Sequence, residues 1–137
     1  MGIPAGVGIP AAGAIIFDRS RRLLLIQRAK APSAGRWSVP GGRCEPDEEP
    51  ADACVREVRE ETGLVVEVLR FAGRVVRNAP AGGVFVIDDY VCEVVAGELQ
   101  AGDDAAAAGW FSLAQLDELQ LAEGLVSTLR EWNLMPA

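Results

Sequence analysis

The 137 residues fall within the usual size of one domain, and half of them are apolar, which suffices for one buried core. We therefore expect residues 1–137 to form a single domain. Acidic residues outnumber Lys and Arg by 20 to 13, and the formal charge of -7 argues against a nucleic acid polymer as partner. A phosphate-bearing substrate would need divalent cations and well-placed arginines to offset the repulsion.

Cysteine and histidine usage narrows the kinds of metal site. Cys44, Cys54 and Cys92 show no CxxC spacing, which predicts free thiols in a reducing compartment. Histidine is absent, so carboxylates and backbone carbonyls remain as ligands, and these favour hard cations over zinc. No apolar run approaches the roughly 20 residues that span a bilayer, and residues 1–17 lack the basic start of a signal peptide. We expect a cytoplasmic protein without a membrane partner.

The first half of the chain predicts two strands and a helix. Apolar residues 11–17 and 23–27 read as strands of one core sheet around a polar turn. Proline and glycine recur over residues 29–42, which predicts a loop without regular structure. Pro50, apolar spacings of three and four, and Gly63 predict a helix over roughly residues 50–62. Its expected buried stripe comprises Ala51, Cys54, Val55, Val58 and Thr62.

The second half predicts a hairpin followed by helices. Residues 64–76 and 84–95 are rich in β-branched side chains, and the turn-forming residues 78–83 separate them. Trp110 and Phe111 close the sheet region. Ser112 is expected to cap a short helix through Leu116, and helical spacing of apolar residues predicts a last helix over residues 121–132. Strands mixed with helices indicate an α/β fold with helices covering a mixed sheet.

Three glutamates of the predicted helix form a candidate cation site. Glu57, Glu60 and Glu61 lie at i, i+3 and i+4, which places their carboxylates on one side, away from the buried stripe. A bound Mg²⁺ would relieve their mutual repulsion. Alternatively the face is only solvated, with Glu60 paired to Arg56 at i, i+4. A structural calcium site is a further alternative, but the twelve-residue loop of EF-hands is missing.

The residues around these glutamates resemble a known family. From Gly42 the chain has five residues, Glu48, seven residues and then Arg56–Leu64, which reads REVREETGL. This resembles the signature of the Nudix hydrolases, GX5EX7REUXEEXGU with U an aliphatic residue, at every specified position. The resemblance implies a Nudix-type α/β/α sandwich with a mixed sheet, and small bacterial members of the ADP-ribose pyrophosphatase type look most similar.

The resemblance implies roles in metal binding and catalysis. It assigns Mg²⁺ or Mn²⁺ binding to Glu57, Glu60, Glu61 and the backbone carbonyl of Gly41. A metal-activated water would then attack phosphorus. Glu60 or Glu61 is the candidate to accept the water's proton, but a carboxylate tied to a cation is a weak base. Two loop acids, Asp103 and Asp104, are therefore alternative catalytic residues.

Four further residues are expected to support the site. By analogy with the family, Arg56 forms an ion pair with Glu48 that orients the helix. Gly42 lets the backbone pass close to metal and phosphate, and Gly63 ends the helix.

Substrate contacts are expected from residues before the signature. In relatives an arginine at the position of Arg28 reaches the phosphates, although a surface arginine is the alternative. Trp37 could stack on a base, or it could anchor the loop onto the core. Asp88 and Asp89 interrupt an apolar strand, so one of them must face inward or toward a cleft.

The signature leaves the leaving group open, because specificity in this family comes from other loops and strands. Pro80, about sixteen residues after the signature, and the run at residues 102–105 are similar to ADP-ribose hydrolases of the family. We expect a nucleoside diphosphate derivative, with ADP-ribose or a similar nucleotide sugar favoured. Nucleoside triphosphates, including oxidised ones, are the competing substrates, and a non-catalytic Nudix-fold sensor is the alternative of another class. An apolar strand or the last helix could form a homodimer interface.

Overall fold

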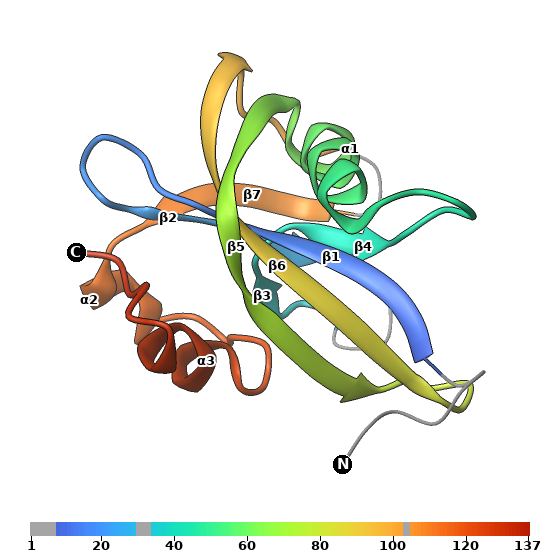
Figure 1. Cartoon of the computed structure of the whole chain (residues 1–137). Coiled ribbons are helices and arrows are strands. Elements are labelled where there is room, and N and C mark those ends of the chain that lie inside the picture. The colour runs from blue at the N-terminus through green and yellow to red at the C-terminus, as the bar shows by residue number, and fades with distance from the viewer. Residues whose placement is uncertain (1–7, 30–33, 103–104) are drawn as a thin grey trace.

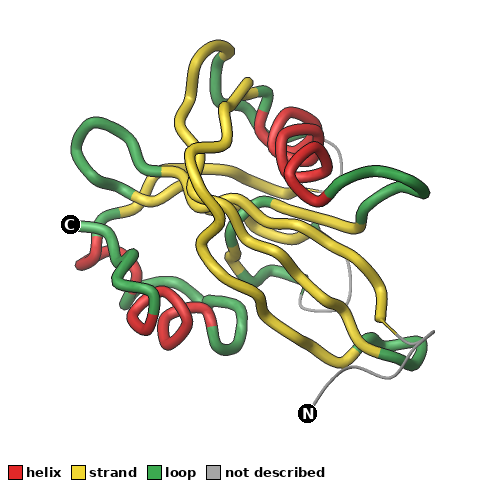
Figure 2. Tube along the Cα trace, in the orientation of Figure 1, coloured by secondary structure: helices red, strands yellow, loops and turns green. Residues whose placement is uncertain are grey.

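A computed structural model describes residues 8–29, 34–102 and 105–137 of the chain (Figure 1). The elements follow one another as β1 (Gly8–Ile16), β2 (Leu23–Arg28), β3 (Trp37–Ser38), β4 (Gly41–Arg43), α1 (Pro50–Thr62), β5 (Leu64–Asn78), β6 (Val84–Gly97), β7 (Ala105–Phe111), α2 (Leu113–Leu116) and α3 (Leu125–Glu131). Figure 2 shows the strands lying between α1 on one side and the two C-terminal helices on the other. The predicted α/β fold with a mixed sheet and flanking helices is confirmed.

The strands form two sheets rather than the single core sheet expected from the sequence. The four-stranded sheet has the order β4-β1-β6-β5, with β1 parallel to β6. The three-stranded sheet has the order β3-β2-β7 and is antiparallel. Asp18 accepts hydrogen bonds from the backbone N–H groups of Ser20 and Arg22, both at 2.9 Å, and so fixes a turn that redirects the chain. Only an isolated bridge, between Phe17 and Leu23, joins β1 to β2 at this turn.

Strand β1 contributes to a hydrophobic core on each of its faces. Ala14 and Ile16 lie in the core under α1, whereas Ile15 lies in the core under α2 and α3. This alternation follows from the two-residue period of a strand. Residues of β1 and of α1 are therefore packed directly against each other, and Val58 of α1 is fully buried there. The core on this side fixes the helix that carries the three glutamates.

Helix α1 spans the residues that the sequence predicted. Pro50 lies in the first turn, and Gly63 ends the helix with a left-handed φ of 76°. The N–H of Gly63 donates to the carbonyl of Arg59 at 2.9 Å. The buried stripe differs from the prediction, because Ala51 and Val55, which were expected inside, are only half-buried, whereas Ala53 is buried. The helix is rotated slightly from the predicted orientation.

The predictions for two segments, residues 29–42 and the start of the last helix, are wrong in detail. Residues 29–42 were expected to lack regular structure, but they include β3 and the start of β4, which pair with β2 and β1. The last helix was expected from residue 121, yet α3 begins at Leu125. Gly124 has a φ of 81°, which no helix continues through, and Leu121 instead bridges to Trp37. The short helix α2 begins as predicted, with a capping box between Ser112 and Gln115.

Some apolar residues of the four-stranded sheet are exposed, namely Leu69 and Phe71 of β5 and Val95 of β6. The expected homodimer stays a prediction.

The three cysteines are free thiols, as predicted, and the sulfurs of Cys54 and Cys92 lie 3.6 Å apart. Within residues 8–29, 34–102 and 105–137 no helix is long and apolar enough to cross a bilayer.

Candidate active site

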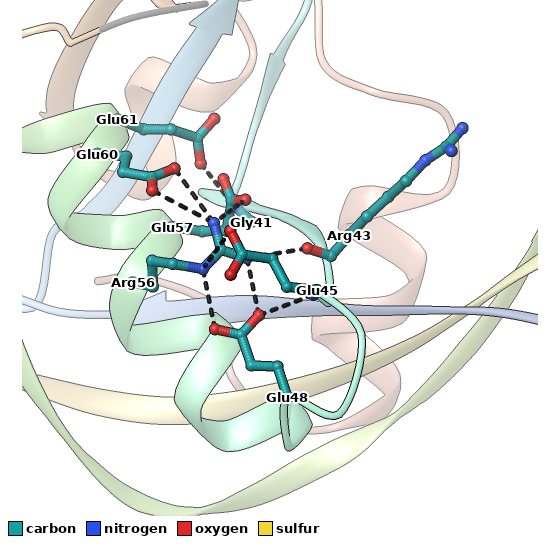
Figure 3. Close-up of polar contacts among 8 residues, drawn as sticks. All are labelled: Gly41, Arg43, Glu45, Glu48, Arg56, Glu57, Glu60 and Glu61. Atoms are coloured by element: carbon teal, nitrogen blue, oxygen red, sulfur yellow. Dashed lines mark hydrogen bonds and ion pairs between the residues drawn. The ribbon is translucent and has the colours of Figure 1, made fainter.

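Glu57 lies over the backbone of the glycine pair in β4. A Cβ atom added to Gly42 would lie 2.6 Å from the carboxyl carbon of Glu57, closer than any real contact. Glycine at this position therefore makes room for the carboxylate, whereas its expected closeness to metal and phosphate stays a prediction. Figure 3 shows the glutamates of α1 lined up along the helix beside this segment.

Glu61 ties α1 to the start of β4. Its Oε1 accepts a hydrogen bond from the backbone N–H of Gly41 at 2.8 Å. The residue is only 7% exposed, whereas the side chain of Glu60 is 53% exposed. Glu61 is thus buried because the β4 segment covers its side of the helix. Glu60 is the member of the set that reaches solvent.

Arg56 connects the acidic residues to one another (Figure 3). Its Nε and Nη2 each donate to the carboxylate of Glu48 at 2.9 Å, which is the predicted ion pair in its two-pronged form. Its Nη1 donates to Glu57 at 2.9 Å and to Glu60 at 3.2 Å. The ion pair between Arg56 and Glu60 at i, i+4, which the sequence left as an alternative, is thus also present. One guanidinium offsets the repulsion among three carboxylates.

These contacts shift the proton affinities of the site. Hydrogen bonds from Arg56 lower the pKa of Glu48 from 4.5 to about 2. The same hydrogen bonds to Glu48 raise the pKa of Arg56, which keeps it charged. Burial raises the pKa of Glu57, and the nearby Arg56 opposes this shift. A partly buried carboxyl that resists ionisation is one that a bound cation would stabilise in its charged form.

Two contacts of this network have no signal in the sequence. Arg56 Nη2 also donates to the backbone carbonyl of Arg43 at 3.0 Å. The backbone N–H of Glu45 donates to Glu48 Oε1 at 2.9 Å. Backbone groups occur at every position, so residue identity alone could not single out these two.

The NUDIX domain model matches residues 8–132, which includes all the elements of both sheets. This chain belongs to the Nudix family. The expectation of a Nudix pyrophosphohydrolase, made from the signature, is confirmed by this match and by the hydrolases among its relatives.

Three relatives of this Nudix protein indicate its range of similarity. The ADP-ribose pyrophosphatase of Methanocaldococcus jannaschii is 36% identical over 121 residues, which cover 86% of this chain and 71% of that protein. The 8-oxo-dGDP phosphatase NUDT18 of Danio rerio is 33% identical over 103 residues, which cover 72% of this chain and 30% of that protein. The crystal structure of the MutT Nudix hydrolase from Burkholderia pseudomallei is 32% identical, covers 90% of this chain and 96% of that chain, and has a TM-score of 0.79.

The residues expected to touch substrate lie on the second sheet of this Nudix protein. Arg28 is the last residue of β2, and its backbone carbonyl accepts from Gly35 at 2.8 Å. The ring of Trp37 packs edge-on against Phe111, with centroids 4.9 Å apart, and belongs to the core under α3. This contact favours the anchoring role of Trp37 over base stacking. The expected loop acids, Asp103 and Asp104, lie outside the described residues.

The paired aspartates of β6 are both buried. Asp88 accepts hydrogen bonds from Arg74 at 2.7 and 3.2 Å. Asp89 is 7% exposed, and its Oδ1 is the one buried side-chain oxygen without a hydrogen-bond partner in the described part of the chain. The sequence predicted that one of the two must face inward, and the structure buries both.

The acidic cluster of this Nudix protein fits a hard cation by its chemistry. All of its donor atoms are oxygens, and the carboxylate of Glu57 occupies the space that a side chain at Gly42 would need. Among the described residues no three acidic, histidine or cysteine side chains converge closely enough to hold an ion. Arg56 Nη1 lies between Glu57 and Glu60 and supplies the positive charge there.

Proposed function

We propose that this protein cleaves the pyrophosphate bond of a nucleoside diphosphate linked to another moiety, with Mg²⁺ or Mn²⁺ as cofactor. The observation that carries this proposal is the placement of Glu61 and Glu57 beside Gly41 and Gly42 of β4. Glu60 is joined to Glu57 through Arg56. The intact set of glutamates argues against a sensor that has lost turnover. ADP-ribose or a similar nucleotide sugar is the favoured substrate, and the protein would act in the cytoplasm.

The metal would be held by carboxylates of Glu57, Glu60 and Glu61, with the carbonyl of Gly41 as a backbone ligand. When bound, it neutralises charge on the phosphate oxygens and makes a bound water more acidic. Glu57 and Glu60 would exchange the Nη1 contact of Arg56 for this cation. Arg56 would keep its two hydrogen bonds to Glu48, so the helix stays oriented from behind.

Glu60 is the favoured acceptor for the proton of the attacking water. Its side chain is 53% exposed and so meets solvent, whereas Oε1 of Glu61 already accepts from the N–H of Gly41. A carboxylate that faces solvent can pass the accepted proton on to bulk water. Asp103 and Asp104 remain alternatives for this step. Arg28 would bind phosphate oxygens with its planar guanidinium.

Two observations bear on the choice of substrate. The relative from Methanocaldococcus jannaschii is an ADP-ribose pyrophosphatase, and this chain covers most of its length. Pro80 lies in the exposed turn between β5 and β6. Its spacing from the signature is the one that resembles ADP-ribose hydrolases of the family. The Danio rerio relative acts on an oxidised nucleotide, which keeps oxidised nucleotides as the second candidate class.

The test is a hydrolysis assay with Mg²⁺ on ADP-ribose, other nucleotide sugars, dinucleotides and nucleoside triphosphates, including 8-oxo-dGTP. Products are identified by mass, and Glu60→Gln is run in parallel. We expect turnover of one class, lowered in Glu60→Gln by at least about 100-fold. Glu67→Gln, an exposed glutamate of β5, is the matched control and should keep full activity.

The same proteins are tested for Mg²⁺ binding by thermal shift. Stabilisation of the wild type by Mg²⁺, reduced in Glu60→Gln, is expected. Mg²⁺ binding without turnover of any compound would overturn the enzymatic proposal in favour of the sensor. Turnover that needs no divalent cation would overturn the assignment of the glutamates.

A further inference from the structure

Two of the three cysteines contact each other in the core under α1. Cys54 of α1 is fully buried and Cys92 of β6 is 3% exposed, and their Sγ atoms lie 3.6 Å apart. The two residues are 38 positions apart in the chain, so only the folded protein brings them together. Two groups held in contact in this way react with each other far more readily than the same groups free in solution.

The two sulfurs are close enough to be joined by a small movement. A disulfide has an S–S length of about 2.05 Å, so the sulfurs would have to approach each other by about 1.5 Å. A shift of α1 against the sheet can supply this distance, because packed helices move by about 1 to 2 Å in conformational transitions.

The position of Cys54 links this pair to the acidic cluster. Cys54 lies three residues before Glu57, which is about one helical turn. Its Sγ is also a donor to the carbonyl oxygen of Gly13 at 3.4 Å, and Gly13 pairs with Gly41, whose N–H donates to Glu61. A disulfide sulfur carries no proton, so Cys54 would give up its donation to Gly13. The movement of α1 toward β6 would then displace Glu57 and Glu61 relative to β4.

The chemistry of the pair differs from that of an ordinary buried thiol. A cysteine buried among apolar groups is inert, because burial disfavours the thiolate. Here the hydrogen bond with Cys54 lowers the pKa of Cys92, although burial opposes this shift. Cys92 is therefore the nucleophile of the pair, and Cys54 is the second thiol that reacts with it. Burial raises the pKa of the half-buried Cys44, which serves as the comparison outside the pair.

We propose that Cys54 and Cys92 are a site of reversible oxidation, at which a peroxide joins them in a disulfide that shifts α1 and lowers turnover. The effect on turnover rests on the proposed function, whereas formation of the disulfide does not. Because both sulfurs are buried, the peroxide reaches them during local opening of α1 from the sheet. Oxidation is therefore expected over minutes to hours.

The reaction with hydrogen peroxide takes two steps. The thiolate of Cys92 attacks one oxygen of the peroxide, the O–O bond breaks, and Cys92 becomes a sulfenic acid while hydroxide leaves. The hydroxide takes up the proton that Cys92 released and forms water. The sulfur of Cys54 then attacks the sulfur of Cys92, the S–O bond breaks, and the hydroxyl leaves with the proton of Cys54 as a second water. The two thiols thereby lose two electrons, and one peroxide is reduced to two waters.

The test begins with peptide mapping by mass spectrometry. The reduced protein is incubated with hydrogen peroxide for minutes to hours, the remaining thiols are blocked, and the protein is digested. We expect two peptides joined through Cys54 and Cys92 in the wild type, and their separation after treatment with dithiothreitol. Cys44→Ala is the matched control and should give the same joined peptides, whereas Cys54→Ala and Cys92→Ala should give none.

Turnover is measured on the same samples. Oxidation should lower the turnover of the wild type and of Cys44→Ala by at least about 10-fold, because a displacement of about 1 Å in a catalytic group can cost about 100-fold. Dithiothreitol should restore it. The same peroxide treatment should leave the turnover of Cys54→Ala and Cys92→Ala unchanged. Urea midpoints show whether each variant is folded, and the wild type with and without dithiothreitol tests the proposal even where a variant is not.

Peptide mapping and turnover keep this inference separate from the proposed function. Turnover in the reduced protein without joined peptides after oxidation would refute the oxidation site and leave the function standing. Joined peptides with unchanged turnover would likewise overturn the inference. Joined peptides in a protein that cleaves no compound would refute the proposed function and leave the oxidation site standing.

Discussion

Arg56 shows how a single residue can stabilise an acidic site. Its guanidinium donates to three carboxylates and to the carbonyl of Arg43. Lysine could not replace it, because an ammonium group is a point charge without the planar fork that engages Glu48 twice. The acidic face of α1 is therefore compatible with a stable helix before any cation binds.

The lowered pKa of Glu48 predicts a loss of stability in acid. The pKa of Glu48 falls from 4.5 to about 2 on folding. The pairing with Arg56 therefore contributes its full stabilisation to the free energy of unfolding above pH 4.5, and this stabilisation is lost as the pH falls through about 2. Glu48→Gln has no proton to gain, and its stability should decline less steeply over that interval. Urea midpoints at about pH 7, 4 and 2.5 measure the difference. Glu118→Gln, an exposed glutamate after α2, should follow the wild type, and equal slopes in Glu48→Gln would contradict the ion pair.

At the scale of the elements, glycines with positive φ decide where helices begin and end. Gly63 ends α1 at φ 76°, and Gly124 precedes α3 at φ 81°. The backbone before Gly124 is thereby free to run along Trp37, whose N–H donates to Gln120 at 2.8 Å and whose carbonyl accepts from Ala122 at 2.8 Å. The C-terminal segment is fastened to β3 in consequence.

Substitution of Gly124 should destabilise the protein, and the loss should be larger for a residue that adopts the left-handed backbone conformation less readily. Gly124→Ala is expected to cost about 1 kcal/mol, because a Cβ is disfavoured at positive φ. Gly124→Asn should cost less, since asparagine tolerates this conformation. Urea unfolding of the two variants measures both values. If alanine were tolerated as well as asparagine, the strain assigned to this position would be absent.

Local signals predicted some elements well and failed where pairing is long-range. Pro50 and Gly63 mark both ends of α1, so the sequence specified this helix to the residue. Strands β3 and β4 were missed because their partners lie in β2 and β1, and the glycines and prolines of the segment resemble an ordinary loop. The reach of Glu61 to Gly41 and the isolation of Asp89 depend on such pairings too. The signature residues identified the chemistry, whereas their contacts required the fold.

At the scale of the whole molecule, β1 joins the two cores into one unit. Ile15 is 1% exposed and packs with Leu129 of α3, while its neighbours in β1 pack under α1. Ile15→Val should lower the free energy of unfolding by about 1 kcal/mol through the lost methylene. Tryptophan fluorescence and far-UV circular dichroism should report the same urea midpoint, as for one cooperative unit. Val76→Ala, at an exposed site of β5, is the control, and two separate midpoints would show that the cores unfold independently.

The parallel pairing of β1 with β6 also constrains how the chain acquires its structure during synthesis. Gly8 faces Val84, 76 positions further along, and the whole of β1 keeps this offset. At ribosomal rates of 5–20 residues per second, β1 waits about 4 to 15 s for its central partner to be made. During that interval its apolar residues 11–16 have only the short β4 to pair with. We therefore expect this amino-terminal strand to stay accessible to chaperones while the rest of the chain is made.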